Sequence, residues 1–160
     1  MSDPIKPPAA RRPEEALELV SLALSDGDLE AALAQYEKAA LLAHWPKGVV
    51  DDEGDVRAAL TAFMALRLPL RVRVIIVLES PDLALVVCER RVAGTDPDGG
   101  LVRLTGHGCA MLRPQPDGSW RITADVWHVG PELPPDPPEI PPVLGGDAGW
   151  REGLGGQPHH

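Results

Sequence analysis

Apolar residues recur at helical spacing in the first part of the chain. Pro13 followed by Glu14 and Glu15 is typical of a helix N-terminus, because proline fits the first helical position and the helix dipole favours acids there. An apolar stripe through residues 16–24 predicts the first helix. After a Ser-Asp-Gly-Asp break, in which either aspartate could serve as the cap, a second stripe from Leu29 to Tyr36 predicts another helix. A third opens in the acidic stretch 51–55 and stops at Pro69.

Beyond Pro69 the spacing changes to that of extended chain. Turn-forming segments rich in Pro, Asp and Gly separate four β-rich runs. These runs are Leu70–Glu79, Leu83–Thr95, Leu101–Arg113 and Ser119–Val129. Helices first and an antiparallel meander afterwards predict an α+β fold rather than alternating βαβ units.

The two ends of the chain differ from the part between them. Residues 1–12 are polar and proline-rich, and residues 131–160 are rich in proline and then glycine, so neither should form a helix or a sheet interior. We therefore expect one domain over residues 13–130, between a flexible N-terminal tail and a disordered C-terminal tail.

Charge and composition exclude some classes of protein. The formal net charge is −9, and no stripe of Lys and Arg offsets it, which disfavours nucleic-acid binding. The longest apolar run, Val74–Leu78, is too short to span a membrane, and the N-terminus has no signal-peptide pattern, so we expect a cytoplasmic protein. Cys88 and Cys109 lie in apolar strand patterns and are expected to be free thiols.

Four segments, in the right order, resemble a known superfamily. They are Ala23–Tyr36, Val49–Leu60 with its Val56-Arg57 pair, the hairpin at 94–99 and the hairpin at 113–122. Together they are similar to SnoaL-like and DUF4440-type members of the NTF2-like superfamily, which includes ketosteroid isomerase-like proteins. The resemblance covers residues 14–129. It implies three helices packed on a strongly curved, mainly antiparallel sheet that encloses a cone-shaped apolar pocket, and a homodimer formed through the sheet.

The resemblance also shows what this chain lacks. Isomerase members use a tyrosine, a carboxylate base and a protonated aspartate, an arrangement for which ketosteroid isomerase is a standard example. Those positions fall on Val20, His44 and Cys109 here, so steroid isomerase chemistry is not expected. Epoxide-hydrolase relatives carry an Arg-x-Asp pair, which the strand at 105–111 also lacks.

A histidine at the position of the base suggests a different proton acceptor. Histidine is the side chain whose unperturbed pKa lies nearest neutrality, so His44 could take a proton. His107 and His128 could converge on the same cavity as further catalytic candidates. Three histidines could also hold Zn²⁺, but their wide separation makes a metal unexpected, and we expect no cofactor. The residues predicted to line the pocket are Val20, Tyr36, Trp45, Phe63, Cys109, Met111, Ala124 and Val126.

The register of the last strands decides which polar side chains face the pocket. With Ile122, Ala124, Val126 and His128 inward, Asp125 is predicted to face outward. A one-residue slip would reverse that prediction, and either Glu89 or Arg90 could point inward, where its charge would need a partner.

Two functions follow from the sequence. In the first, the protein binds a small apolar ligand and catalyses proton transfer, in the manner of an isomerase or cyclase, with His44 as the base. In the second, it is a non-catalytic ligand-binding or dimerisation module with an interaction tail.

Overall fold

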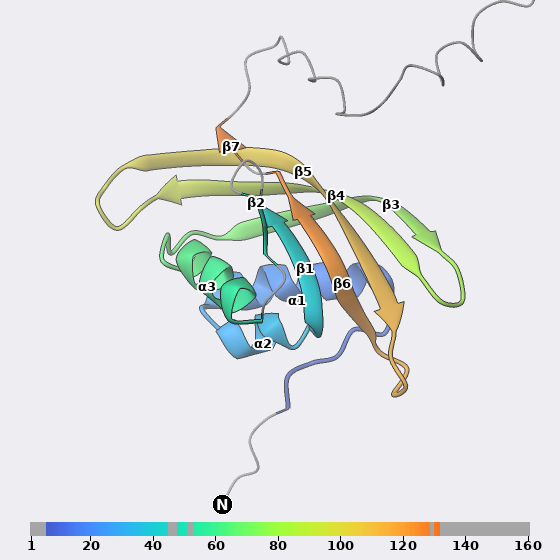
Figure 1. Cartoon of the computed structure of the whole chain (residues 1–160). Coiled ribbons are helices and arrows are strands. Elements are labelled where there is room, and N and C mark those ends of the chain that lie inside the picture. Colours follow the sequence, from blue (N-terminus) through green and yellow to red (C-terminus); the bar gives the residue numbers. More distant parts are fainter. Residues whose placement is uncertain (1–5, 45–47, 51–52, 129, 132–160) are drawn as a thin grey trace, which may run out of the picture.

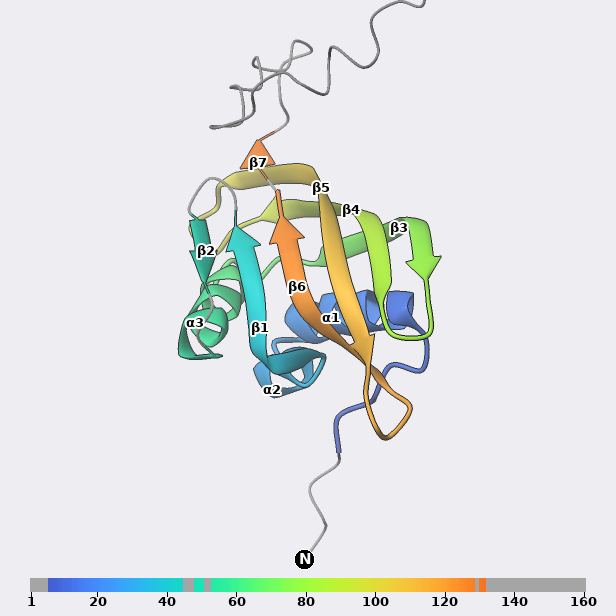
Figure 2. The same cartoon turned by 45° about the vertical axis from the view of Figure 1, so that its right-hand side comes forward.

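The computed structural model describes residues 6–44, 48–50, 53–128 and 130–131. Three helices, α1 (Pro13–Asp26), α2 (Leu29–Leu33) and α3 (Glu53–Met64), lie on the concave side of one curved sheet (Figures 1 and 2). Its strands are β1 (Tyr36–His44), β2 (Gly48–Val50), β3 (Leu70–Glu79), β4 (Ala84–Thr95), β5 (Leu101–Pro114), β6 (Trp120–Trp127) and β7 (Gly130–Pro131). The predicted α+β fold with three helices on a curved sheet is confirmed.

Local sequence signals set the helix boundaries. Pro13 occupies the first turn of α1, and Gly27 ends that helix in the left-handed conformation (φ 75°), which glycine adopts without a steric cost. Asp28 caps α2, where its Oδ1 accepts a hydrogen bond from the N–H of Ala31 at 3.0 Å. Of the two aspartates that the sequence offered as a cap, Asp28 is the one used.

Tyr36 belongs to a strand and not to the second helix, so the helical stripe predicted to run to Tyr36 is wrong at its end. Helix α2 ends at Leu33, and the Ile122 N–H donates to the carbonyl of Gln35 at 2.8 Å. Tyr36 then lies opposite Ile122 in a parallel β1–β6 pair. Sheet pairing overrides the helical spacing here.

The strands follow the order β2-β1-β6-β5-β4-β3, and β7 pairs with β5. The β1–β6 pair is parallel, and the other pairs among the described strands are antiparallel, so the sheet is mainly antiparallel as predicted. The buried face of the sheet packs on α1, which Ser21 and Ser25 tie to Leu70 at the start of β3. The core is aliphatic, with Leu17, Val86, Leu112 and Ile122 fully buried.

Two β-bulges change which side chains face the helices. Along β3, Val74 lies opposite Cys88 but Ile76 lies opposite Val87, so Ile75 is extra. Along β6, Ile122 lies opposite Leu112 and Ala124 lies opposite Met111, so Thr123 is extra. Because side chains alternate along a strand, one inserted residue moves all those after it to the other face.

The N-terminal segment makes contacts with the domain. Ala10 is fully buried, and its carbonyl accepts a hydrogen bond from the N–H of Trp120 at 2.9 Å. The carbonyl of Pro8 accepts another from Nε2 of Gln35 at 2.8 Å. Residues 8–11, which we expected in a flexible tail, therefore contact the connection between α2 and β1, the turn before β6 and the start of β6. Within the described part of the chain, no helix is both long and apolar enough for a membrane span.

Candidate functional site

Four polar or aromatic side chains meet in the core on the concave side of the sheet. Tyr36 comes from β1, Arg90 from β4, and Asp125 and Trp127 from β6. All four are buried, with the Arg90 and Asp125 side chains only 2% and 1% exposed. We call these four residues the buried cluster.

Asp125 is the centre of the buried cluster. Its Oδ1 accepts from Nη2 of Arg90 at 2.9 Å, and its Oδ2 accepts from the Tyr36 hydroxyl at 2.8 Å and from Nε1 of Trp127 at 2.6 Å. Arg90 also donates from Nη1 to the carbonyl of Val126 at 3.1 Å. Within the described residues, no buried side-chain nitrogen or oxygen lacks a partner, as burial of charge requires.

Arg90 must cross β5 to reach Asp125, and the glycine at position 108 makes that possible. Arg90 lies opposite Gly106, and Asp125 lies opposite Ala110, so the side chain passes over Gly108, midway between them. A Cβ atom at position 108 would overlap Nη1 of Arg90 and would lie 2.8 Å from the carbonyl oxygen of Val126. The guanidinium of Arg90 can therefore cross β5 because Gly108 has no side chain to block it.

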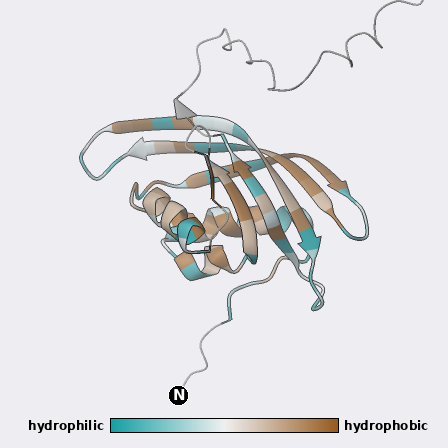
Figure 3. Cartoon of the chain, viewed as in Figure 1, coloured by the Kyte–Doolittle hydropathy of each residue, from teal (hydrophilic) through white to brown (hydrophobic). Residues whose placement is uncertain are grey.

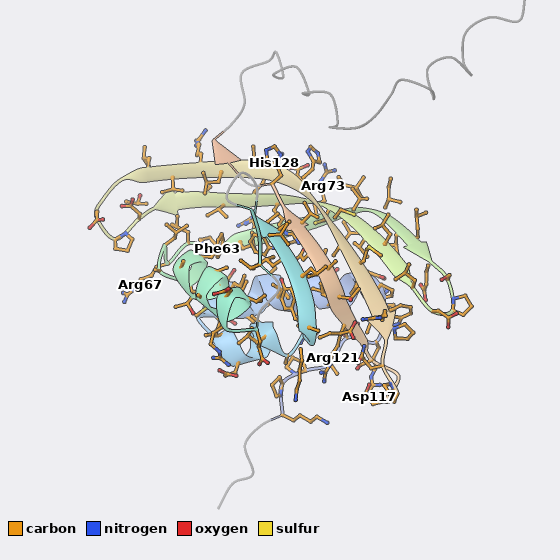
Figure 4. All side chains as sticks on the ribbon, in the orientation of Figure 1. Phe63, Arg67, Arg73, Asp117, Arg121 and His128 are labelled. Atoms are coloured by element: carbon orange, nitrogen blue, oxygen red, sulfur yellow. The ribbon has the colours of Figure 1, made fainter. Side chains whose placement is uncertain are left out.

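Aromatic rings enclose the charged pair. The guanidinium carbon of Arg90 lies 4.5 Å from the centre of the Trp127 ring, within range of a cation–π interaction. Phe63 of α3 meets the same ring edge-on, with ring centres 5.5 Å apart. Figure 4 shows Phe63 on the helix side of the sheet. The pair is thus held between the sheet and α3.

Burial and charge fix the protonation of the cluster. Burial raises the pKa of Tyr36 well above its ordinary value, and the negative charge of Asp125 raises it further. Burial alone would lower the pKa of Arg90, but the neighbouring Asp125, with smaller contributions from Cys88 and Tyr36, raises the pKa overall. Tyr36 is therefore a neutral donor and Arg90 a cation.

The hydrogen bonds within the cluster limit its chemistry. The Tyr36 hydroxyl and the Trp127 indole N–H both donate to Asp125, so neither proton is free for a ligand. Asp125 is engaged through both oxygens, one with Arg90 and the other with Tyr36 and Trp127, so neither oxygen is left without a partner. The cluster braces β1, β4 and β6 together across β5.

The prediction that Asp125 faces outward is wrong. The register that we inferred holds at Ile122, which is buried, and fails after the bulge at Thr123. Asp125 and Trp127 then face inward, while Val126 is 44% exposed on the outer face. Of the alternatives at 89 and 90, Arg90 points inward, and Glu89 bonds to Arg73 and Arg91 on the outer face.

The predicted register of β5 is also shifted by one residue. Gly108, Ala110 and Leu112 are buried, so Cys109 and Met111 alternate to the outer face together with Ala124 and Val126 of β6. These four residues were predicted to line the pocket, and their inward orientation is wrong. Val20, Tyr36 and Phe63 do lie on the helix side, with Val20 and Tyr36 buried.

The structure does not bring the three predicted catalytic histidines, His44, His107 and His128, together among the residues that it describes. His107 and His128 are exposed, so the prediction that they face the interior is wrong (His128 is labelled in Figure 4). The backbone of His44 lies opposite Trp127, but the His44 side chain and the whole of Trp45 lie outside what the structure describes. The catalytic role of His44 stays a prediction. No group of three potential metal-ligating His, Cys, Asp or Glu side chains is found among the described residues.

A groove of about 300 Å³ opens where α2, the start of β1 and the start of α3 meet. We call it the α2–α3 groove. Tyr36 is among its lining residues, so the groove borders the buried cluster. Charged side chains surround it on both the helix and strand sides. The lining residues are Pro7, Glu30, Leu33, Ala34, Tyr36, Glu37, Lys38, Ala40, Glu53, Val56, Arg57 and Arg121.

The sequence predicts only some of the residues of the buried cluster and the groove. The sequence predicts Tyr36 at the pocket wall, and it allows Asp125 and Arg90 to face inward as an alternative. The available signal was the Gly-x-Gly-x-Ala pattern at 106–110, whose small side chains on one face leave room for a long neighbour. The bulge at Thr123 has no comparable local signature.

Comparison with known proteins agrees with the fold. No protein-family model matches the chain, and no curated protein matches it. A ketosteroid isomerase-like protein from Erwinia carotovora atroseptica superposes with a TM-score of 0.64 at 18% identity, over 71% of this chain and 90% of that one. An NTF2-like protein of unknown function from Shewanella oneidensis gives 0.58 at 18% identity, over 71% and 93%. The chain therefore has the NTF2-like, ketosteroid isomerase-like fold.

Breaking the buried ion pair should cost far more stability than breaking an exposed one. Arg90→Leu leaves the carboxylate of Asp125 buried without its cation, and should lower the free energy of unfolding by about 3–5 kcal/mol. Arg73→Leu is the matched control, because it removes an exposed arginine from the ion pair with Glu89, and should cost less than about 1 kcal/mol. Urea unfolding of both variants measures the difference.

The double variant Arg90→Leu/Asp125→Leu should lose less stability than the sum of the two single variants, because no lone charge remains buried. A cost for Arg90→Leu no greater than that of the Arg73→Leu control would contradict the role of the buried pair.

Proposed function

We propose that this protein binds a small, largely apolar molecule in the α2–α3 groove and acts as a homodimer. The observation that carries the proposal is the groove itself. Its volume of about 300 Å³ is at the lower end of the range for small-molecule sites, and its lining combines apolar residues with six charged ones. Three apolar lining residues, Leu33, Ala40 and Val56, are called here the floor of the groove.

A catalytic step is not part of this proposal. The buried cluster has its donor protons engaged internally, and the described groove contains no histidine or cysteine. Binding is therefore the function that the described groove supports best.

The outer face of the sheet supports the dimer. One cross-strand row runs through Leu41, Ala124, Met111, Leu85 and Leu78, and the next runs through Val49, Ala43, Val126, Cys109, Val87 and Ile76. We call these the outer apolar rows. The exposed members include Leu78 at 58% and Leu41 at 46%. In Figure 3 the end of β3 that carries Leu78 is brown, marking hydrophobic residues.

A continuous apolar face that spans the sheet is unfavourable in water and typical of a protein–protein interface. The same surface on a second copy would cover it, because a two-fold axis pairs a patch with itself. Homodimerisation through the sheet, which the sequence resemblance implies, thus has a physical reason in these two rows.

Filling the groove should abolish binding of an apolar probe. Ala34 is half-buried at the groove wall, and Ala34→Phe would place a ring in the space that a ligand would occupy. We expect this variant to bind 1-octanol at least about tenfold more weakly than the wild type, a loss of about 1.4 kcal/mol. Nuclear magnetic resonance titration of the labelled protein with 1-octanol gives both affinities.

The matched control is Ala39→Phe, since Ala39 is exposed on β1 and does not line the groove. Its affinity for 1-octanol should equal that of the wild type. Absence of any 1-octanol binding, or equal binding by the wild type and Ala34→Phe, would refute the groove as the ligand site.

A charge in the outer apolar rows should dissociate the dimer. Met111 lies in the middle of one row, so Met111→Glu would bury a carboxylate without a partner and raise the dissociation constant at least about tenfold. Sedimentation velocity over a concentration series measures the constant. Leu22→Glu is the control, since Leu22 is 61% exposed on α1 and should leave the dimer intact. A monomeric wild type would refute the dimer.

A further inference from the structure

The charged groups at the α2–α3 groove are unevenly partnered. On the helix side, Nη1 of Arg57 lies 2.6 Å from Glu30, and that pairing holds the pKa of Glu30 below its usual value. On the strand side, Glu37 is paired with Arg113 at 2.9 Å. Two of the three acids at the rim are therefore already neutralised.

Two cations on the strand side are not neutralised in this way. Lys38 of β1 and Arg121 of β6 line the groove, and neither forms an ion pair within the part of the chain that the structure describes. Figure 4 shows Arg121 beside the beginning of β1. Two cations without an ion pair therefore lie at this end of the groove, although the protein as a whole carries a charge of −9.

Two further acids, Glu53 and Asp117, lie in or beside the groove and form no ion pair with these cations within the described residues. Glu53, the third acid of the rim, begins α3, and its charge acts on Arg57 on the helix side. Asp117 lies in the turn before β6, where its Oδ1 accepts from the N–H of Ser119 at 2.9 Å and from the Ser119 hydroxyl. Asp117 lines a neighbouring cavity that Arg121 also borders, and the hydrogen bonds from Ser119, followed by the charge of Arg121, lower the pKa of Asp117. Arg121 therefore feels the charge of Asp117 but forms no ion pair with it among the described residues.

From this arrangement we infer the chemical class of the ligand, an inference that rests on the proposed binding function. The ligand is an amphiphilic carboxylate, whose carboxylate lies between Lys38 and Arg121 and whose aliphatic body lies along Leu33, Ala40 and Val56. A guanidinium and an ammonium form charge-assisted hydrogen bonds with a carboxylate, and Arg matches its planar geometry. The apolar body removes hydrocarbon surface from water against the floor.

The test compares two probes that differ in the head group. Octanoate and 1-octanol have the same aliphatic chain, so a difference in affinity at neutral pH reports the carboxylate. We expect the full chain to bind octanoate at least about tenfold more tightly than 1-octanol, the effect of one charge-assisted hydrogen bond. The Lys38→Gln/Arg121→Gln variant should bind both probes within about threefold of each other, with its affinity for 1-octanol unchanged.

Arg103→Gln is the control, because Arg103 is an exposed arginine on β5 that does not line the groove, and it should leave both affinities unchanged. Equal affinity of the wild type for the two probes would overturn the carboxylate inference and leave the binding function standing. A preference for octanoate that persists in the Lys38→Gln/Arg121→Gln variant would also overturn the carboxylate inference and leave the binding function standing. Failure of the wild type to bind either probe would refute the binding function itself.

Discussion

The ion pair between Arg90 and Asp125 is the interaction on which the rest of this structure depends. Two nearly inaccessible charges are stable in a protein interior only when each is fully hydrogen-bonded. Here Asp125 also accepts from Tyr36 and Trp127, which ties β1 and β6 to β4. The pair requires a glycine at position 108, where Arg90 crosses β5, and the bulge at Thr123, which turns Asp125 inward.

The buried cluster gives the two faces of the sheet different properties. On the concave side, the polar atoms of the buried cluster are hydrogen-bonded to one another. The α2–α3 groove beside Tyr36 is therefore better suited to binding a ligand than to catalysis by the cluster. On the convex side, the same bulge at Thr123 that turns Asp125 inward turns Val126 outward and completes the outer apolar rows. One inserted residue thus shapes both the interior network and the surface proposed to form the dimer.

Much of the fold could be predicted from the sequence, because helix caps, turns and alternation are local signals. Pro13, Asp28 and the turn before Leu101 all act where the sequence indicates. The site could not be predicted in the same way, since its residues depend on register. Period-2 alternation places Asp125 outside, and the bulge at Thr123 reverses that without a sequence mark of its own. Only the small residues at 106–110 hinted that a long side chain crosses there.

The ionisation of Tyr36 is the most direct test of the buried cluster, because Tyr36 is the only tyrosine in the chain. Its pKa is raised by burial and by Asp125, so above about pH 10 the unfolded state loses the phenolic proton while the folded state keeps it. Stability should then fall with rising pH, by up to about 1.4 kcal/mol per pH unit. An absorbance titration should show tyrosinate only well above pH 10 or together with unfolding. Tyrosinate formation near pH 10 in a protein that stays folded would contradict the account.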